Sequence, residues 1–309
     1  MSTGEPPVPL SETERALCVA AARMHYLEDR SKTDIAEALD ISRFKVARLL
    51  GLAREHRIVR IEIEDSAVDL ERSDRLAALL GLDRAVVTSG DVAVAAADLL
   101  SVVLDDGDVL GLPWSRTVAR MIEHLHDLPR VDAVQLTGAH HAPELDTSAV
   151  AIVRAVARAS GGSAHLFFAP FVAQDAETAA AFARQAEVRA ARSELSRVTH
   201  AVVAAGSWGA GQSTIYDAVT PAERTEAKEA GVVGEIAGIF LDASGAAVEG
   251  LAAARLVTLS RQELRHIPHV ALLATGPDKA ATVRAAVAGG LVETLVCDRA
   301  LAQVLLDAT

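Results

Sequence analysis

Short apolar runs alternate with helix-like stretches along most of this chain. From residue 85 onward the runs are "AVVT", "DVLGL", "VDAVQLT", "AHLFFA", "HAVVAAG", "EIAGIFL", "RLVTLS", "HVALLAT" and "ETLVC". Apolar strands separated by helices are typical of a mostly parallel sheet that is covered by helices on both faces. The alternation therefore predicts an α/β domain built on such a sheet.

Size and composition agree with this expectation. A chain of 309 residues suits one large α/β domain or a small domain joined to a larger one. Half of its residues are apolar but only 3% are aromatic, which suits helices packed closely on a sheet. Cys18 and Cys297 lie far apart in the sequence and outside any CxxC motif, so we expect both to pack as small apolar residues.

Membrane and export signals do not stand out in the sequence. No apolar run free of charges reaches the roughly 18 residues that a membrane span needs. The N-terminal "MSTGEPPVPL" lacks the basic-then-apolar pattern of a signal peptide. We therefore expect a cytoplasmic protein without a membrane partner.

The first part of the chain carries the start signals of three helices. Ser11 with Glu14, and Ser31 with Asp34, have the spacing of a capping box, and Ser42 is an expected N-cap. After the third helix, "IVRIEIE" (58–64) has the alternation of a short strand. The sequence thus predicts a disordered lead-in (1–10), a helix-turn-helix domain (11–64) and an α/β domain (65–309).

Residues 31–57 have the pattern of a helix-turn-helix. Ala36 is small where the two helices would touch, and Asp40 tolerates the left-handed backbone of a tight turn. The third helix would bury Val46, Leu49, Leu50 and Ala53 and expose Ser42, Arg43, Phe44, Lys45 and Arg48. Exposed cations are what contacts to DNA phosphates require. The alternative for the whole motif is a helical hairpin that only packs within the protein. For Phe44 two roles are open: contact with a thymine methyl group, or cover for an apolar patch of the protein.

The charge of the chain is divided unevenly. The formal net charge is −12, yet the first 60 residues hold ten Lys and Arg against nine Asp and Glu. Within residues 43–60 there are six cations against one acid, Glu55. A basic surface on an otherwise acidic molecule can attach one end of it to a polyanion, so the overall charge does not argue against DNA binding.

Two stretches have the strand–turn–helix pattern that collects anions. In "GDVLGLPWSRT" (107–117) a helix is expected to start around Ser115, and free N–H groups at a helix N-terminus favour an anion. In "LLATGPDKAATVRAA" (272–286), Lys279 falls in the first helical turn, where a cation is unfavourable unless an anion offsets it. For the first stretch, the alternative is an ordinary capped helix whose Arg116 faces solvent. For the second, the alternative is that Lys279 is simply solvated.

Other motifs are weaker. "GSWGAG" (206–211) follows a strand, but helix-like sequence resumes only near Pro221, so we expect a loop that lines a ligand, Gly206 included, and no dinucleotide fingerprint. His140 and His141 are adjacent and are not expected to chelate one metal ion. Because no Ser/His/Asp or Cys/His set stands out, we expect no catalytic residue, no metal and no cofactor.

Taken in order, several segments resemble those of the SorC-type (sorbitol-operon regulator) sugar-binding transcriptional regulators. They are "AARMHYLEDRSKTDIAEALDISRFKVARLLGLAREHRIVRIEI", "DVLGLPWSRTVA", "VQLTGAH", "AGVVGEIAGIFLDASG" and "LRHIPHVALLATGPDKAATVRAAVAGGLVETLVCD". The resemblance implies a Rossmann-like effector domain similar to phosphosugar isomerases and glucosamine-6-phosphate deaminases. It also implies binding of a sugar or sugar phosphate without turnover, operator DNA as a partner, and a tetramer.

The resemblance also implies roles for single residues. Those matching the operator-reading helix are Ser42, Arg43, Phe44, Lys45 and Arg48. Those matching the effector site are Trp114, Ser115, Arg116, Thr117, Gln135, Gly138, Asp146, Glu235, Asp242 and Lys279. Glu235 and Asp242 would face sugar hydroxyl groups, and Lys279 would lie near a charged group of the effector.

Four positions depart from the family pattern. Asp40 and Arg57 stand where glycine is usual, and a left-handed conformation would cost Arg57 roughly 1 kcal/mol. Ser115 also replaces a usual glycine, and Pro277 lies in a turn that tends to be acidic or to contain glycine. The last two bear on which effector binds and whether it is phosphorylated.

Two functions follow as hypotheses. The first is a DNA-binding transcriptional regulator whose C-terminal domain binds a sugar or sugar phosphate that modulates operator binding. The alternative is an isomerase- or deaminase-type enzyme with an appended helical module, in which Glu235 or Asp242 would be the base. The basic third helix favours the regulator, because an isomerase has no use for it.

Overall fold

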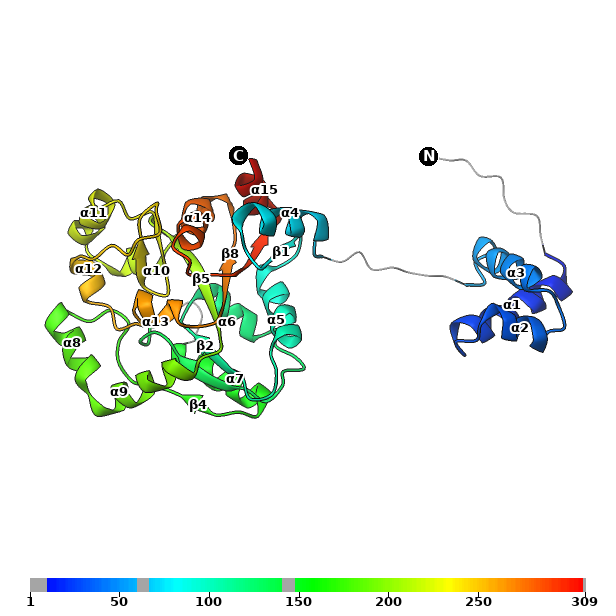
Figure 1. Cartoon of the computed structure of the whole chain (residues 1–309), viewed down its shortest axis with the longest axis horizontal. Helices are drawn as coiled ribbons and strands as arrows, with labels where there is room; N and C mark the ends of the chain where they lie inside the picture. Colours follow the sequence, from blue (N-terminus) through cyan, green and yellow to red (C-terminus); the bar gives the residue numbers. More distant parts are fainter. Residues whose placement is uncertain (1–9, 60–66, 141–147, 308–309) are drawn as a thin grey trace. The chain divides into compact units, whose positions relative to one another are not determined.

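The chain forms two compact units, Met1–Asp65 and Ser66–Thr309, each with its own hydrophobic core (Figure 1). The structure is a computed structural model that describes residues 10–59, 67–140 and 148–307. The predicted lead-in (1–10) and the predicted strand (58–64) lie largely outside these residues. None of the described helices is long and apolar enough to cross a membrane.

The first unit consists of three helices around a small core. They are α1 (Glu12–Tyr26), α2 (Lys32–Ala38) and α3 (Arg43–Glu55). The predicted N-caps Ser11, Ser31 and Ser42 are confirmed, because each side chain accepts a hydrogen bond from the backbone N–H three residues later. The core contains Cys18, Ala21, Ala22, Ile35, Ala36, Val46, Leu49, Leu50 and Ala53.

Two residues in this unit adopt the left-handed conformation that glycine would take at lower cost. Asp40, between α2 and α3, has φ of 50°, and Arg57, just after α3, has φ of 55°. At both positions the resemblance described above implies glycine. The turn is therefore built with side chains that disfavour its backbone, and the buried contacts of α2 and α3 must hold it.

The second unit is built on a mostly parallel sheet, which confirms the predicted fold class. Its strands are β1 (Arg84–Thr88), β2 (Val109–Leu112), β3 (Asp132–Gln135), β4 (Ala164–His165), β5 (His200–Ser207), β6 (Gly234–Ile236), β7 (Ile239–Leu241), β8 (His269–Ala274) and β9 (Thr294–Asp298). Seven of them lie in the order β1-β9-β8-β5-β2-β3-β4 and pair in parallel. The hairpin β6–β7 adds to β5 in antiparallel fashion.

Helices cover both faces of this sheet. Those of the second unit are α4 (Leu70–Leu80), α5 (Val92–Val103), α6 (Arg116–Ile122), α7 (Ala149–Ser160), α8 (Ala176–Arg184), α9 (Ala186–Ser193), α10 (Thr214–Ala218), α11 (Pro221–Glu229), α12 (Leu251–Ala254), α13 (Arg261–Arg265), α14 (Ala280–Ala288) and α15 (Arg299–Asp307), with 3-10 turns η1 (Glu194–Arg197) and η2 (Pro277–Lys279). Successive residues of a strand face opposite sides. In β9, Leu295 and Cys297 pack with α4, α14 and α15, and Val296 between them packs with α5, α6 and α7.

Two apolar runs do not become strands of the parallel sheet. "EIAGIFL" is the β6–β7 hairpin, which turns at Ala237 and Gly238, both with positive φ. "RLVTLS" (255–260) makes only isolated bridges, Val172 with Leu256 and Thr137 with Thr258. Apolar sequence alone does not distinguish these segments from central strands of the sheet. Whether a segment becomes a central strand depends on its pairing with strands that are distant in the sequence.

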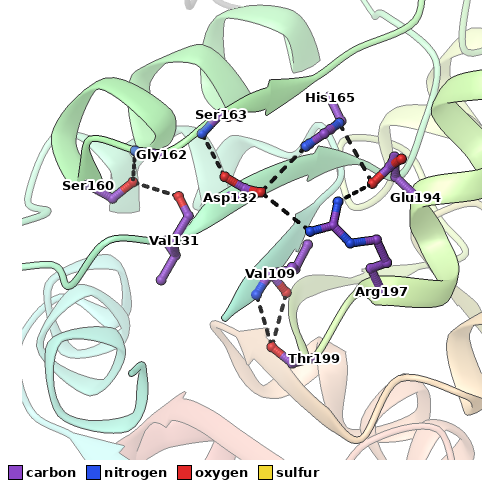
Figure 2. A network of polar contacts seen from close by, with 10 residues as sticks. All are labelled: Val109, Val131, Asp132, Ser160, Gly162, Ser163, His165, Glu194, Arg197 and Thr199. Atoms are coloured by element: carbon purple, nitrogen blue, oxygen red, sulfur yellow. Dashed lines mark hydrogen bonds and ion pairs between the residues drawn. The ribbon is translucent and has the colours of Figure 1, made fainter. Parts of the chain in front are cut away.

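A polar network ties together the amino-terminal ends of strands on one side of the sheet (Figure 2). Asp132, the first residue of β3, accepts a 2.8 Å hydrogen bond from the Ser163 backbone N–H and lies 3.7 Å from both His165 Nε2 and Arg197 Nη2. Arg197 also donates to Glu194 at 2.6 Å. The network links β3, β4 and η1. Asp132 begins β3, so this network does not belong to the cavity described below, which lies at the carboxyl-terminal ends of strands.

Candidate functional site

Helix α3 presents the first candidate surface. Ser42 Oγ accepts the Lys45 backbone N–H at 3.2 Å, so regular helix begins at Arg43. Val46, Leu49, Leu50 and Ala53 are buried against α1 and α2 as predicted. The predicted reading residues Ser42, Arg43, Phe44, Lys45 and Arg48 are all exposed, and Phe44 keeps 89% of its surface accessible. A helix whose first turn is basic and open is what contact with the DNA major groove needs.

The second candidate site is a cavity at the carboxyl-terminal ends of β2, β5 and β8. Strands β3 and β4 extend the sheet to one side of β2, and β5, β8 and β9 extend it to the other. The strand order therefore reverses between β2 and β5, and ligands of open α/β sheets bind in the crevice at such a point. The cavity has a volume of about 250 Å³. It is lined by Pro113, Trp114, Ser115, Arg116, Thr117, Phe171, Ala204, Ala205, Gly206, Gly211, Gln212, Ser213, Thr214, Ile215, Glu235, Ala237, Leu273, Thr275 and Lys279.

Two cations from different elements converge on this cavity. Arg116, the first residue of α6, donates to the Gly211 backbone oxygen at 2.9 Å. Lys279, at the end of η2, donates to the Gln212 backbone oxygen at 2.6 Å. Burial lowers the pKa of Lys279, whereas the charge of Glu235 acts in the opposite direction. Because both cations are held by neutral carbonyl groups of one loop, an anionic ligand would offer them a stronger partner.

A buried carboxyl group also lines the cavity. Glu235, on β6, accepts from Ser213 Oγ at 3.0 Å and from the Gly238 backbone N–H at 3.1 Å. Burial raises the pKa of Glu235 above its ordinary value, and these hydrogen bonds act against the rise. Gly206 leaves the space for this carboxyl group, since a Cβ atom there would lie 2.1 Å from Glu235 Oε1.

The segment from Trp114 to Thr117, which the resemblance matched to the effector site, lines the cavity. Ser115 is the N-cap of α6, and its Oγ accepts the Val118 backbone N–H at 3.0 Å. Its φ of −157° is extended, so this position does not need glycine. Trp114 is 5% exposed, and the centroid of its ring lies 4.7 Å from that of the His140 ring. The serine hydroxyl is thus used by the helix, whereas Arg116 lines the cavity and donates to the Gly211 carbonyl.

Three predicted effector residues do not line this cavity. Gln135 uses its side chain to bind the Thr137 carbonyl and the Phe167 N–H. Asp242 accepts hydrogen bonds from Ser244 and Ala246 in the turn after β7 and is not part of the cavity lining. Gly138 is tightly packed, because a Cβ atom there would lie 2.4 Å from the Pro170 carbonyl oxygen. Asp146, a fourth prediction, lies outside the described residues.

Several lining residues were not singled out from the sequence. Gln212, Ser213 and Thr214 follow the "GSWGAG" loop, and α10 begins at Thr214, so the expectation that helix resumes only near Pro221 was wrong. Ser213 both caps α10 and binds Glu235. Its N-cap chemistry could have predicted α10, but its contact with Glu235 depends on the β5–β6 pairing. Among the described residues, no three His, Cys, Asp or Glu side chains gather to hold a metal ion.

Comparison with known proteins places these features in context. Residues 67–307 match the family described as "Putative sugar-binding domain". The chain is 27% identical over 310 aligned residues to the transcriptional regulator LsrR of Enterobacter sp. (strain 638), covering 96% of this chain and 94% of that protein. It is 24% identical to the deoxyribonucleoside regulator of Bacillus subtilis (strain 168), covering 96% and 99%. The full-length sorbitol operon regulator SorC of Klebsiella pneumoniae has the same fold, with a TM-score of 0.70 at 23% identity over 96% of this chain and all of that one.

Proposed function

The chain belongs to the family described as "Putative sugar-binding domain", and from this premise we propose that it is a DNA-binding transcriptional regulator controlled by a sugar or sugar phosphate. One observation carries the proposal. A single chain holds an exposed basic helix in one unit and, in the other, a cavity with two cations at the switch point of an α/β sheet. That pairing suits a sensor of small molecules that acts on DNA.

The DNA-binding part of the proposal assigns α3 to the major groove. Arg43 and Lys45 stand on the two flanks of its first turn, and cations in these places can contact the phosphates of the two strands. The similar proteins are called regulators, which supports the proposed regulatory function of this chain.

The effector part assigns an anionic group to the two cations. Arg116 and Lys279 would exchange backbone carbonyl groups for a phosphate or carboxylate, and Glu235 would accept hydrogen bonds from hydroxyl groups of the sugar. Turnover is not part of the proposal. Of the two bases that an isomerase could use, Asp242 is committed to a turn, and Glu235 is already paired with Ser213 and Gly238.

Control of DNA binding would then arise from linked equilibria. The effector can shift the protein from one arrangement of its subunits to another only if it binds the two arrangements with different affinity. We expect the protein to act in the cytoplasm. We also expect a tetramer, since several linked subunits can present paired reading helices at a fixed spacing.

The test is a gel-shift titration of the full-length protein on DNA from its own upstream region, with and without a panel of sugars and sugar phosphates. We expect a specific complex and at least one compound that changes the apparent affinity without being consumed. Arg43→Ala and Arg48→Ala should weaken the complex, whereas Arg158→Ala, which removes an exposed cation from α7, should not. Equal binding by all variants would remove the assignment of α3, and turnover of the compound would favour an enzyme.

A further inference from the structure

The side chain of Phe44 is unusually open for a large apolar group. It is 89% exposed, the highest value among the exposed large apolar side chains of the described residues. The sequence left two roles for Phe44, contact with a thymine methyl group or cover for an apolar patch of the protein. Its exposure removes the second role within the described residues. Phe44 is therefore available to a partner.

The position of Phe44 on α3 points to the partner. At 3.6 residues per turn, Phe44, Arg48 and Gly51 project about 150–170° from the middle of the buried stripe of α3. They form its outermost ridge. Gly51 has open space around it, since a Cβ atom there would meet nothing within 4 Å, and Ala47 beside the ridge is exposed and small. A ridge with small residues lets a helix approach the floor of the groove closely.

The chemistry of the ridge then restricts what each side chain can read. A phenyl ring neither donates nor accepts a hydrogen bond at a base edge, and packing it on the polar edges of a G·C pair would leave those groups unpaired. The major groove offers one apolar group on its base edges, the C5-methyl group of thymine. Arg48 can bind guanine O6 and N7 with its two parallel N–H groups.

We propose that Phe44 determines sequence specificity by packing on the C5-methyl group of one thymine in each half-site, while Arg48 reads a base pair nearby. The inference rests on the proposed DNA binding. The four residues from Phe44 to Arg48 advance the helix by about 6 Å, and one base-pair step is about 3.4 Å, so the two contacts should fall within about two base pairs.

The experiment removes only the methyl group. Operator sequences are first selected from a random DNA pool with the full-length protein. Each thymine of the selected site is then replaced singly by deoxyuridine, and affinities are measured at one fixed salt concentration. We expect one thymine per half-site at which deoxyuridine weakens binding about fourfold, the factor that burial of one methyl group contributes.

Variants assign that effect to Phe44. In Phe44→Ala, thymine and deoxyuridine should bind equally at that position, and the exposure of Phe44 means that the variant should fold normally, as a thermal melt would verify. The matched control is Arg43→Ala, which should weaken every duplex while keeping the fourfold ratio. Specific binding without a methyl-sensitive thymine, or a methyl effect that persists in Phe44→Ala, would overturn the inference but not the DNA binding. Failure to select any sequence would overturn both.

Discussion

Gly206 and Glu235 pair across the antiparallel strands β5 and β6, and a Cβ atom at residue 206 would lie 2.1 Å from Glu235 Oε1. The absence of a side chain at Gly206 thus leaves the space that the Glu235 carboxyl group occupies. The same carboxyl group holds Ser213, the N-cap of α10. The backbone of β5 therefore positions one polar part of the cavity without contributing a functional group.

Gly206→Ala should reduce effector affinity by displacing the Glu235 carboxyl group. We expect a loss of about tenfold or more, because a hydrogen bond to a charged group contributes about 1.5–3 kcal/mol. Calorimetric titration with the sugar or sugar phosphate found by screening measures it. Gly209→Ala, in the loop that follows β5, is the control, since the nearest atom to its Cβ would be 3.9 Å away, and it should bind normally. Equal losses in both variants would mean that the loop, and not Glu235, is responsible.

Lys279→Met should separate recognition of charge from recognition of the sugar. The change keeps most of the side-chain length but removes the ammonium group that now donates to the Gln212 carbonyl. We expect affinity for a phosphorylated effector to fall about 10- to 100-fold, from loss of one charge-assisted hydrogen bond and its Coulomb attraction. Affinity for the unphosphorylated sugar should change little. A similar loss for both compounds would place the phosphate elsewhere.

Glycine at residue 57 should stabilise the helical unit. Arg57 has φ of 55°, and relief of the left-handed strain should raise the free energy of unfolding by about 1 kcal/mol. The control is Arg54→Gly inside the last turn of α3, which should destabilise by about 1 kcal/mol. Denaturant titration followed by circular dichroism at a fixed pH compares them. A destabilised Arg57→Gly variant would show that contacts of the arginine outweigh its backbone strain.

Acid should destabilise the second unit partly through His200. Burial lowers the pKa of His200, the stacked His269 ring acts in the same direction, and Asp108 opposes both. The folded pKa is then below the unfolded one, so this contribution is full above about pH 6.5 and is lost as the pH falls through the folded pKa. We expect His200→Asn to flatten the fall in unfolding free energy below about pH 6.5. An unchanged slope would assign the acid sensitivity to other groups.

The helical unit could be predicted closely because its signals are local. Ser11, Ser31 and Ser42 cap helices with groups three residues away, and the buried stripe of α3 follows from its period alone. The parallel sheet was likewise predictable from the runs of apolar residues. The β6–β7 hairpin was missed because its short apolar runs look like buried parallel strands until they are paired.

The cavity was predictable only in part. Arg116 and Lys279 stand at helix starts after strands, a pattern that sequence shows, and the fold brings both to the same place. The family resemblance assigned Asp242 to the effector site, but this residue follows β7, where its carboxyl group caps a turn. Ser213, which donates a hydrogen bond to Glu235, is 22 residues away from it in the sequence. The two meet because β5 pairs with β6.

The proposed regulation requires that the α3 surface and the cavity be energetically coupled in one chain. The most direct measurement compares two factors under the same conditions: the change in DNA affinity at saturating effector, and the change in effector affinity at saturating DNA. Thermodynamic linkage requires the two factors to be equal. We predict equal factors of about 5- to 150-fold, the usual range for allosteric coupling. Factors of one in both directions would show that the helix and the cavity act independently and would contradict the proposed regulation.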